Sequence, residues 1–184
     1  MRLLSTDEAA GVIRAGGVVA YPTESCYGIG CDPLNARAVK RIIRIKGRAI
    51  SKGVILIADH QSRFNRYVVK PTAEIQSRID ATWPGPYTWL IPARPGVPRL
   101  LRGSHDSVAV RVTAHRVSRE LCRLSAMALI STSANRSNRP AIKTLSRIMR
   151  EFDGEIDGVV LGRIGHASKP STITDARTGK VLRS

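Results

Sequence analysis

Small hydroxyl and amide side chains gather directly after an apolar segment near residue 130. Residues 127–130 are predicted to form a buried strand, which runs into the polar stretch 131–135 (Ser-Thr-Ser-Ala-Asn). Open α/β sheets build their binding sites at strand ends, so this stretch is expected to hold a small polar ligand by hydrogen bonds. A serine hydrolase is not indicated, because no His–Asp pair accompanies Ser131, Ser133 or Ser171.

Positive charge precedes a second apolar segment. Lys46, Arg48 and Lys52 stand just before the apolar run 54–57, with a glycine after the first and after the last of them. Lys is a point charge for a phosphate and Arg a bidentate donor, so the three side chains predict an anion site. The alternative is a solvated basic helix end, which the helix dipole favours. A P-loop is absent, and so is the third glycine of a dinucleotide fingerprint.

A lone arginine lies within a third apolar segment. Arg111 is out of phase with the valines of residues 107–112, and burying its charge unpaired would cost several kcal/mol. Its partner is expected to be either a ligand carboxylate or an internal acid such as Asp106 or Asp175. Thr23 and Glu24 follow another predicted strand, where they form either a turn or part of the same site.

Composition narrows the class of protein. The three cysteines are an odd count without a close pair, so we expect neither a disulfide framework nor a zinc site, and a reducing cytoplasm is the default. We expect no membrane association, because no run of eighteen apolar residues occurs. Thirty Lys and Arg against 14 Asp and Glu give a net charge of +16, which favours polyanionic partners, although a basic soluble surface would look the same.

The elements that position these residues alternate irregularly between helix and strand. A capping box at Ser5–Glu8 begins the first predicted helix. Apolar periodicity predicts helices over 5–16, 35–45, 60–67, 72–81, 115–124 and 144–151, strands over 17–21, 54–58, 87–92, 107–112, 127–132, 159–161, 171–174 and 180–183, and loops over 22–33 and 93–105. The pattern predicts an α/β fold in which residues 1–184 form a single domain, with an open, twisted, mixed sheet and flanking helices.

Seven motifs follow one another along the chain: Tyr21-Pro-Thr-Glu-Ser-Cys-Tyr-Gly28, Lys46-Gly-Arg48, Lys52-Gly-Val-Ile-Leu-Ile-Ala58, Trp83-Pro-Gly-Pro86-Tyr-Thr, Val108-Ala-Val-Arg-Val112, Ser131-Thr-Ser-Ala-Asn135 and Pro170-Ser-Thr-Ile173. In this order, they resemble the motifs of the YrdC/TsaC family, the bacterial threonylcarbamoyl-AMP synthases, in their short single-domain form. Each motif is weak alone, but together they are specific and cover nearly the whole chain. The resemblance implies a YrdC-like fold with a concave basic cleft.

The resemblance implies a nucleotidyltransferase that condenses L-threonine, bicarbonate and ATP to threonylcarbamoyl-AMP and pyrophosphate. Partner transferases downstream then complete the threonylcarbamoyladenosine modification next to the tRNA anticodon. It implies Mg²⁺ bound with ATP rather than by protein side chains, and no covalent nucleophile. The net charge of +16, and not the resemblance, is the reason to expect contact with tRNA or double-stranded RNA. The family's ATP-binding positions fall on Arg48, Lys52, Ser133, Asn135 and Arg183, with Lys46 completing the basic cradle and Ala141 near the nucleotide; its threonine-binding positions fall on Thr23, Arg111, Ser131 and Ser171.

Two other functions compete with this hypothesis. The first is a non-catalytic module that binds double-stranded RNA or the ribosome through the same basic cleft, although such a module would not need Thr23, Arg111 and Ser171. The second is a domain that forms an adenylate from carbamoyl phosphate. One departure from the family pattern concerns the nucleotide side, where Asn138 replaces a common glycine.

Overall fold

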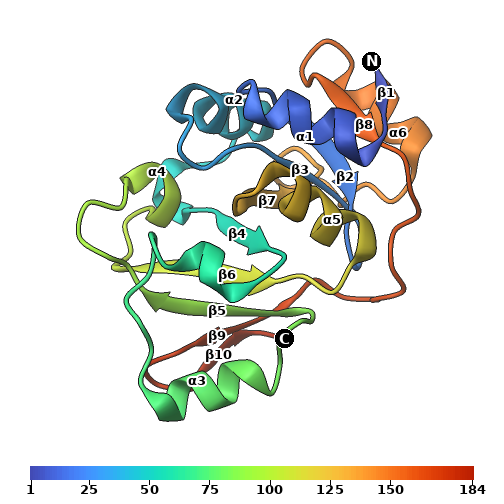
Figure 1. Ribbon diagram of the computed structural model, residues 1–184. Coiled ribbons are helices and arrows are strands. Elements are labelled where there is room, and N and C mark those ends of the chain that lie inside the picture. The colour runs from blue at the N-terminus through green and yellow to red at the C-terminus, as the bar shows by residue number, and fades with distance from the viewer.

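Ten strands form one mixed sheet in the computed structural model, which describes residues 1–184 (Figure 1). The order across the sheet is β1-β8-β2-β3-β7-β4-β6-β5-β9-β10, and both parallel and antiparallel neighbours occur. The strands are β1 (Leu3–Leu4), β2 (Val19–Pro22), β3 (Tyr27–Gly30), β4 (Ile55–Ala58), β5 (Tyr87–Pro92), β6 (Ser107–Val112), β7 (Leu129–Ser133), β8 (Gly158–Val160), β9 (Thr172–Asp175) and β10 (Val181–Arg183).

Helices cover both faces of the sheet, and local signals in the sequence set where several of them begin. Ser5 and Glu8 form the expected capping box, and Asn35 caps the second helix by accepting a hydrogen bond from the Ala38 amide. None of these helices is both long and apolar enough to cross a lipid bilayer. The helices are α1 (Thr6–Arg14), α2 (Ala36–Lys46), α3 (Ala73–Asp80), α4 (Arg99–Arg102), α5 (Arg116–Ser125) and α6 (Leu145–Phe152), with 3₁₀ turns at Ile50–Lys52 and Gln61–Phe64.

The sheet separates a large hydrophobic core from a small one. The large core joins α2, α3 and α6 to one face, and the valines of β6 point into it. The small core joins α1 and α5 to the opposite face, where they cover part of β2, β4, β7 and β8. In Figure 1, α3 lies beside β9 and β10, far from α1 and α5. Because α1 and α5 cover only part of their face, the other strands on that side are left without a helical layer.

Most predicted elements are present, but four short ones were missed, including the 3₁₀ turn at Ile50–Lys52. The predicted loop 22–33 contains β3, whose Gly28 and Gly30 lower its strand signal although it pairs on both sides. The loop 93–105 contains the four-residue helix α4, and residues 3–4 form an edge strand. The expected helix over 60–67 is only a 3₁₀ turn at Gln61–Phe64.

Candidate active site

A cavity of about 690 Å³ opens on the face of the sheet that α1 and α5 leave uncovered. A row of residues from five neighbouring strands lies along its floor. In the register of the sheet, Ser131 pairs with Ile55, Ile55 with Ala109, Ala109 with Leu90 and Leu90 with Asp175. All five line the cavity, so the floor is continuous across β7, β4, β6, β5 and β9.

Strand periodicity explains how a charged residue reaches this cavity from an apolar strand. Val108, Val110 and Val112 point into the large core, whereas Ala109 and Arg111 line the cavity on the other face. Gly28 of β3, which is not adjacent to β6, also lines the cavity, and a Cβ there would lie 3.1 Å from Cγ2 of Thr23. The out-of-phase position of Arg111 in the sequence is therefore a true indication of its place in the site.

The residues assigned to threonine by resemblance converge on this cavity. Thr23, Arg111, Ser131 and Ser171 all line it, and each is at most 8% exposed. The Thr23 hydroxyl donates a hydrogen bond to the carbonyl of Cys26 at 2.8 Å. Together they present a guanidinium and three hydroxyl groups within one buried surface, which suits a small ligand that carries a carboxylate and polar groups.

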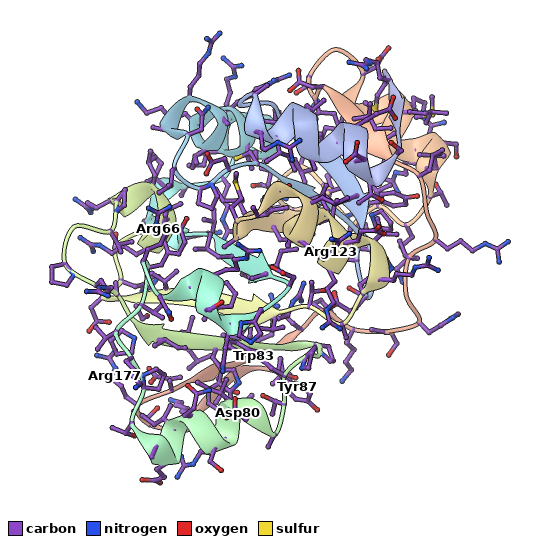
Figure 2. All side chains as sticks on the ribbon, in the orientation of Figure 1. Arg66, Asp80, Trp83, Tyr87, Arg123 and Arg177 are labelled. Atoms are coloured by element: carbon purple, nitrogen blue, oxygen red, sulfur yellow. The ribbon has the colours of Figure 1, made fainter.

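The internal partner of Arg111 is Glu24, with 3.3 Å between Nη2 and Oε2. The expectation that Asp106 or Asp175 could fill this role is wrong. Arg177 binds Asp106 with two hydrogen bonds of 2.7 and 2.9 Å and lies 3.9 Å from Asp175. Figure 2 shows Arg177 on the β5–β9 side of the molecule.

Most residues assigned to ATP by resemblance line the same cavity: Arg48, Lys52, Ser133, Asn135, Ala141 and Arg183. Arg48 donates hydrogen bonds to the carbonyls of Gly53 and Lys52 at 3.1 and 3.3 Å. Arg183 donates to the Ser171 carbonyl at 2.8 Å and to its hydroxyl at 3.2 Å. Burial lowers the pKa of Arg183, and the charges of Arg111 and Arg48 lower it further. Arg183 is thus repelled by two neighbouring guanidinium groups, and an anion would relieve that repulsion.

Lys46 does not line the cavity. Its side chain is buried beneath the 133–135 segment, and its ammonium group donates to the carbonyls of Ser133 and Asn135 and to Asn135 Oδ1. Burial, with Arg48 second, lowers the pKa of Lys46 to about 8. The alternative of a solvated basic helix end therefore does not hold for Lys46. Its side chain instead supports the loop that carries Ser133 and Asn135.

Several polar residues near the site had no role in the sequence analysis. Arg102, Lys143 and Arg177 add positive charge to the cavity lining. Thr88 is fully buried, and its hydroxyl lies 2.8 Å from that of Ser171. Only the basic composition of the loops could have suggested the first three, and no periodic signal marks Thr88. Asn138 has a φ of 63°, a left-handed conformation that Asn tolerates well, so it can replace a glycine there.

Comparison with known proteins gives consistent results. A model of the Sua5/YciO/YrdC family, described as Telomere recombination, matches residues 11–184. The chain is 53% identical over 171 residues to a threonylcarbamoyl-AMP synthase from Methylobacillus flagellatus, covering 93% of this chain and 94% of that protein. It is 50% identical over 175 residues to a protein of the same name from Nitrosococcus oceani, covering 95% of each.

Solved structures agree with the fold. The structure of P. abyssi Sua5 complexed with L-threonine has a TM-score of 0.88 and 31% identity, covering 95% of this chain and 54% of that one. The structure of E. coli YciO has a TM-score of 0.85 and 25% identity, covering 97% of this chain and 88% of that one. Taken with the family match over residues 11–184, these similarities establish that the chain belongs to the Sua5/YciO/YrdC family.

Proposed function

We propose that this protein is a threonylcarbamoyl-AMP synthase, which condenses L-threonine, bicarbonate and ATP and releases pyrophosphate. The observation that carries the proposal is the single cavity in which Arg111 and three hydroxyl side chains adjoin Arg48 and Arg183. Relatives about half identical over nearly their full length carry the name of this enzyme. A related structure was solved with L-threonine, which supports an amino-acid substrate.

The chemistry requires binding and charge neutralisation rather than a protein nucleophile. The threonine nitrogen forms a bond to the bicarbonate carbon, and water leaves. A carbamate oxygen then attacks the α-phosphorus of ATP, the bond to the bridging oxygen breaks, and pyrophosphate departs. Arg111 would hold the threonine carboxylate, while Thr23, Ser131 and Ser171 hold its amino and hydroxyl groups. Arg48, Lys52 and Arg183 would offset the negative charge that develops on the phosphates, with Ser133 and Asn135 as further polar contacts.

Magnesium is proposed to enter with ATP. The carboxylates of the cavity lining are Asp106 and Asp175, and both are occupied by Arg177. This donor set fits an ion held mainly by phosphate oxygens, and the ion would withdraw charge from those oxygens. The protein's own cations supply the remaining neutralisation.

The product defines the next step. A threonylcarbamoyl adenylate is an activated acyl donor, so a separate transferase would pass its acyl group to tRNA, and we propose that this occurs in the cytoplasm. Direct contact of this chain with tRNA or double-stranded RNA is a further proposal, supported by the net charge of +16. Such contact would be mainly electrostatic, because only 4% of the residues are aromatic and few can stack on bases.

The test is pyrophosphate release by nuclease-treated enzyme, with threonine and bicarbonate each omitted in turn. Release should require both substrates and should not require RNA. Strict dependence on added tRNA would contradict the proposed reaction.

RNA binding by the same preparation separates the synthase from the non-catalytic RNA module. For the synthase, log affinity should fall steeply with log salt, by about 0.9 per neutralised duplex phosphate. Salt-insensitive, sequence-selective binding without pyrophosphate release would favour the RNA module. Pyrophosphate release with carbamoyl phosphate in place of bicarbonate and threonine would favour the carbamoyl-adenylate alternative.

A further inference from the structure

We propose that Glu24 is a positioning residue, which holds the Arg111 guanidinium in the orientation that binds the substrate carboxylate. The inference rests on the proposed function, in which Arg111 recognises threonine. Glu24 directly follows Thr23, one of the predicted site residues. Unlike Thr23, it does not line the cavity. Glu24 would act through Arg111 rather than by touching substrate.

The contact between the two side chains is close, but it is not a bidentate bridge. Glu24 Oε2 lies 3.3 Å from Arg111 Nη2, and the side chains are 13% and 10% exposed. Glu24 Oε2 and Arg111 Nε are both buried without a hydrogen-bond partner. The pair is therefore an ionic contact rather than an aligned, bidentate bridge. Glu24 balances the charge and fixes its place through Nη2, without the aligned bidentate pairing that would use a whole edge of the guanidinium.

Glu24 is itself held firmly. Its Oε1 accepts a hydrogen bond of 2.7 Å from the Thr113 hydroxyl, and Thr113 lies two residues after Arg111. Its backbone carbonyl accepts a hydrogen bond from the Ala167 amide at 3.0 Å. Gly165 packs closely against the Glu24 backbone, since a Cβ at this position would lie 2.6 Å from the Glu24 carbonyl oxygen. A glutamate whose side chain and backbone are both held by hydrogen bonds can keep a neighbouring guanidinium in one orientation.

Electrostatics makes this restraint necessary. The charge of Arg111 lowers the pKa of Arg183, so the two guanidinium groups repel each other across the cavity. Without Glu24, Arg111 would lose its only ion-pair partner in the chain while that repulsion remained. An unbalanced buried guanidinium would rotate toward solvent, away from the threonine side.

The test compares Glu24→Gln with Thr113→Val and with a control, Glu74→Gln, which removes the exposed ion pair with Arg78. Pyrophosphate release by each variant gives separate KM values for threonine and ATP. Glu24→Gln should raise the threonine KM by about tenfold or more, a size expected for coupled neighbouring charges, and leave the ATP KM within about twofold. Thr113→Val should shift the threonine KM the same way by a smaller factor, and Glu74→Gln should shift neither.

A double-mutant cycle with Arg111→Lys identifies the route of the effect. If Glu24 acts through Arg111, Glu24→Gln should change the threonine KM much less in the Arg111→Lys background than in the wild type. Fully additive effects, or an unchanged threonine KM in Glu24→Gln, would overturn the inference while the proposed function stood. Equal changes in both KM values with a lower Tm would also overturn it, since that is the mark of general loosening. Wild-type protein that releases no pyrophosphate would overturn both proposals.

Discussion

Replacing Lys46 with methionine should disturb the nucleotide side of the site from below. Methionine has a similar length and keeps the apolar stem, but it removes the ammonium group of a residue that is only 4% exposed. That group donates to two backbone carbonyls and one side-chain amide oxygen of the 133–135 segment. The sequence pattern placed Lys46 in a phosphate cradle, whereas the structure places it under the loop, and the two locations predict different losses.

The size of the effect follows from which acceptors lose their partner. The Ser133 carbonyl still accepts from the Asn135 amide, and Asn135 Oδ1 still accepts from the Ser133 hydroxyl. Only the Asn135 carbonyl loses its sole donor within the chain. A buried acceptor left unpaired costs about 1–3 kcal/mol, and this carbonyl is only partly buried. Lys46→Met should therefore lower the free energy of unfolding by about 1 kcal/mol, the low end of that range, at pH 7.

The pH dependence has a definite sign. Folding lowers the pKa of Lys46 from 10.5 to about 8, so the unfolded state binds more protons between these two values. The free energy of unfolding of the wild type should therefore rise with pH in that window relative to Lys46→Met. Below pH 8 both states hold the proton, and the difference between the two proteins should be constant.

Calorimetry with ATP and AMP distinguishes the two roles of Lys46. A supporting residue should weaken both nucleotides by a similar factor, because Ser133 and Asn135 move together. A direct phosphate ligand should weaken ATP far more than AMP, and it should leave the Tm nearly unchanged. Lys52→Met is the matched control, since Lys52 lines the cavity and is exposed. A selective loss of ATP binding in Lys46→Met at unchanged Tm would refute the argument.

Substitutions at three further positions test the remaining parts of the site. Arg111→Ala should weaken threonine binding by about 2–5 kcal/mol in calorimetry, with ATP binding little changed; unchanged threonine affinity in a folded variant would make Arg111 purely structural. Arg48→Lys should recover only part of the ATP turnover lost in Arg48→Ala, because an ammonium lacks the bidentate edge; full recovery would show that charge alone matters. Thr88→Val should lower the free energy of unfolding by about 1 kcal/mol and raise the threonine KM, because the Ser171 hydroxyl loses its buried partner; an unchanged KM would exclude Thr88 from the site.

Much of this site could be predicted because its polar residues stand within or directly after apolar strands. Arg111 interrupts a run of valines, and residues 131–135 turn polar at the end of an apolar strand. Both departures fall on the cavity face of the sheet, where α1 and α5 provide no cover. A polar residue in a strand is tolerated only where it meets a partner or an open space, so local sequence carries this information.

Partners brought together by long-range pairing could not be predicted. Glu24 and Arg111 form an ion pair although they are 87 residues apart in the sequence (111 − 24). Asp106 and Asp175 were the more obvious candidates, because Asp106 precedes β6 and Asp175 ends β9, yet Arg177 occupies both. The choice among acids depends on the register of the sheet and on loop geometry, neither of which leaves a local signal.

Strand β3 illustrates the same limit and explains the shape of the cavity. Its glycines weaken the strand pattern, but they are required by close packing: a Cβ at Gly30 would lie 2.2 Å from the Ile130 carbonyl. Gly28 pairs with Ser133, and a Cβ at Gly28 would lie 3.3 Å from the Ser131 hydroxyl oxygen. Because Gly28 has no side chain, the space beside Ser131 stays open. Gly28, which weakens the strand signal of β3 in the sequence, thus also makes room for a ligand. The polar residues of the site show in the sequence, whereas the space they surround comes from glycines and tertiary pairing.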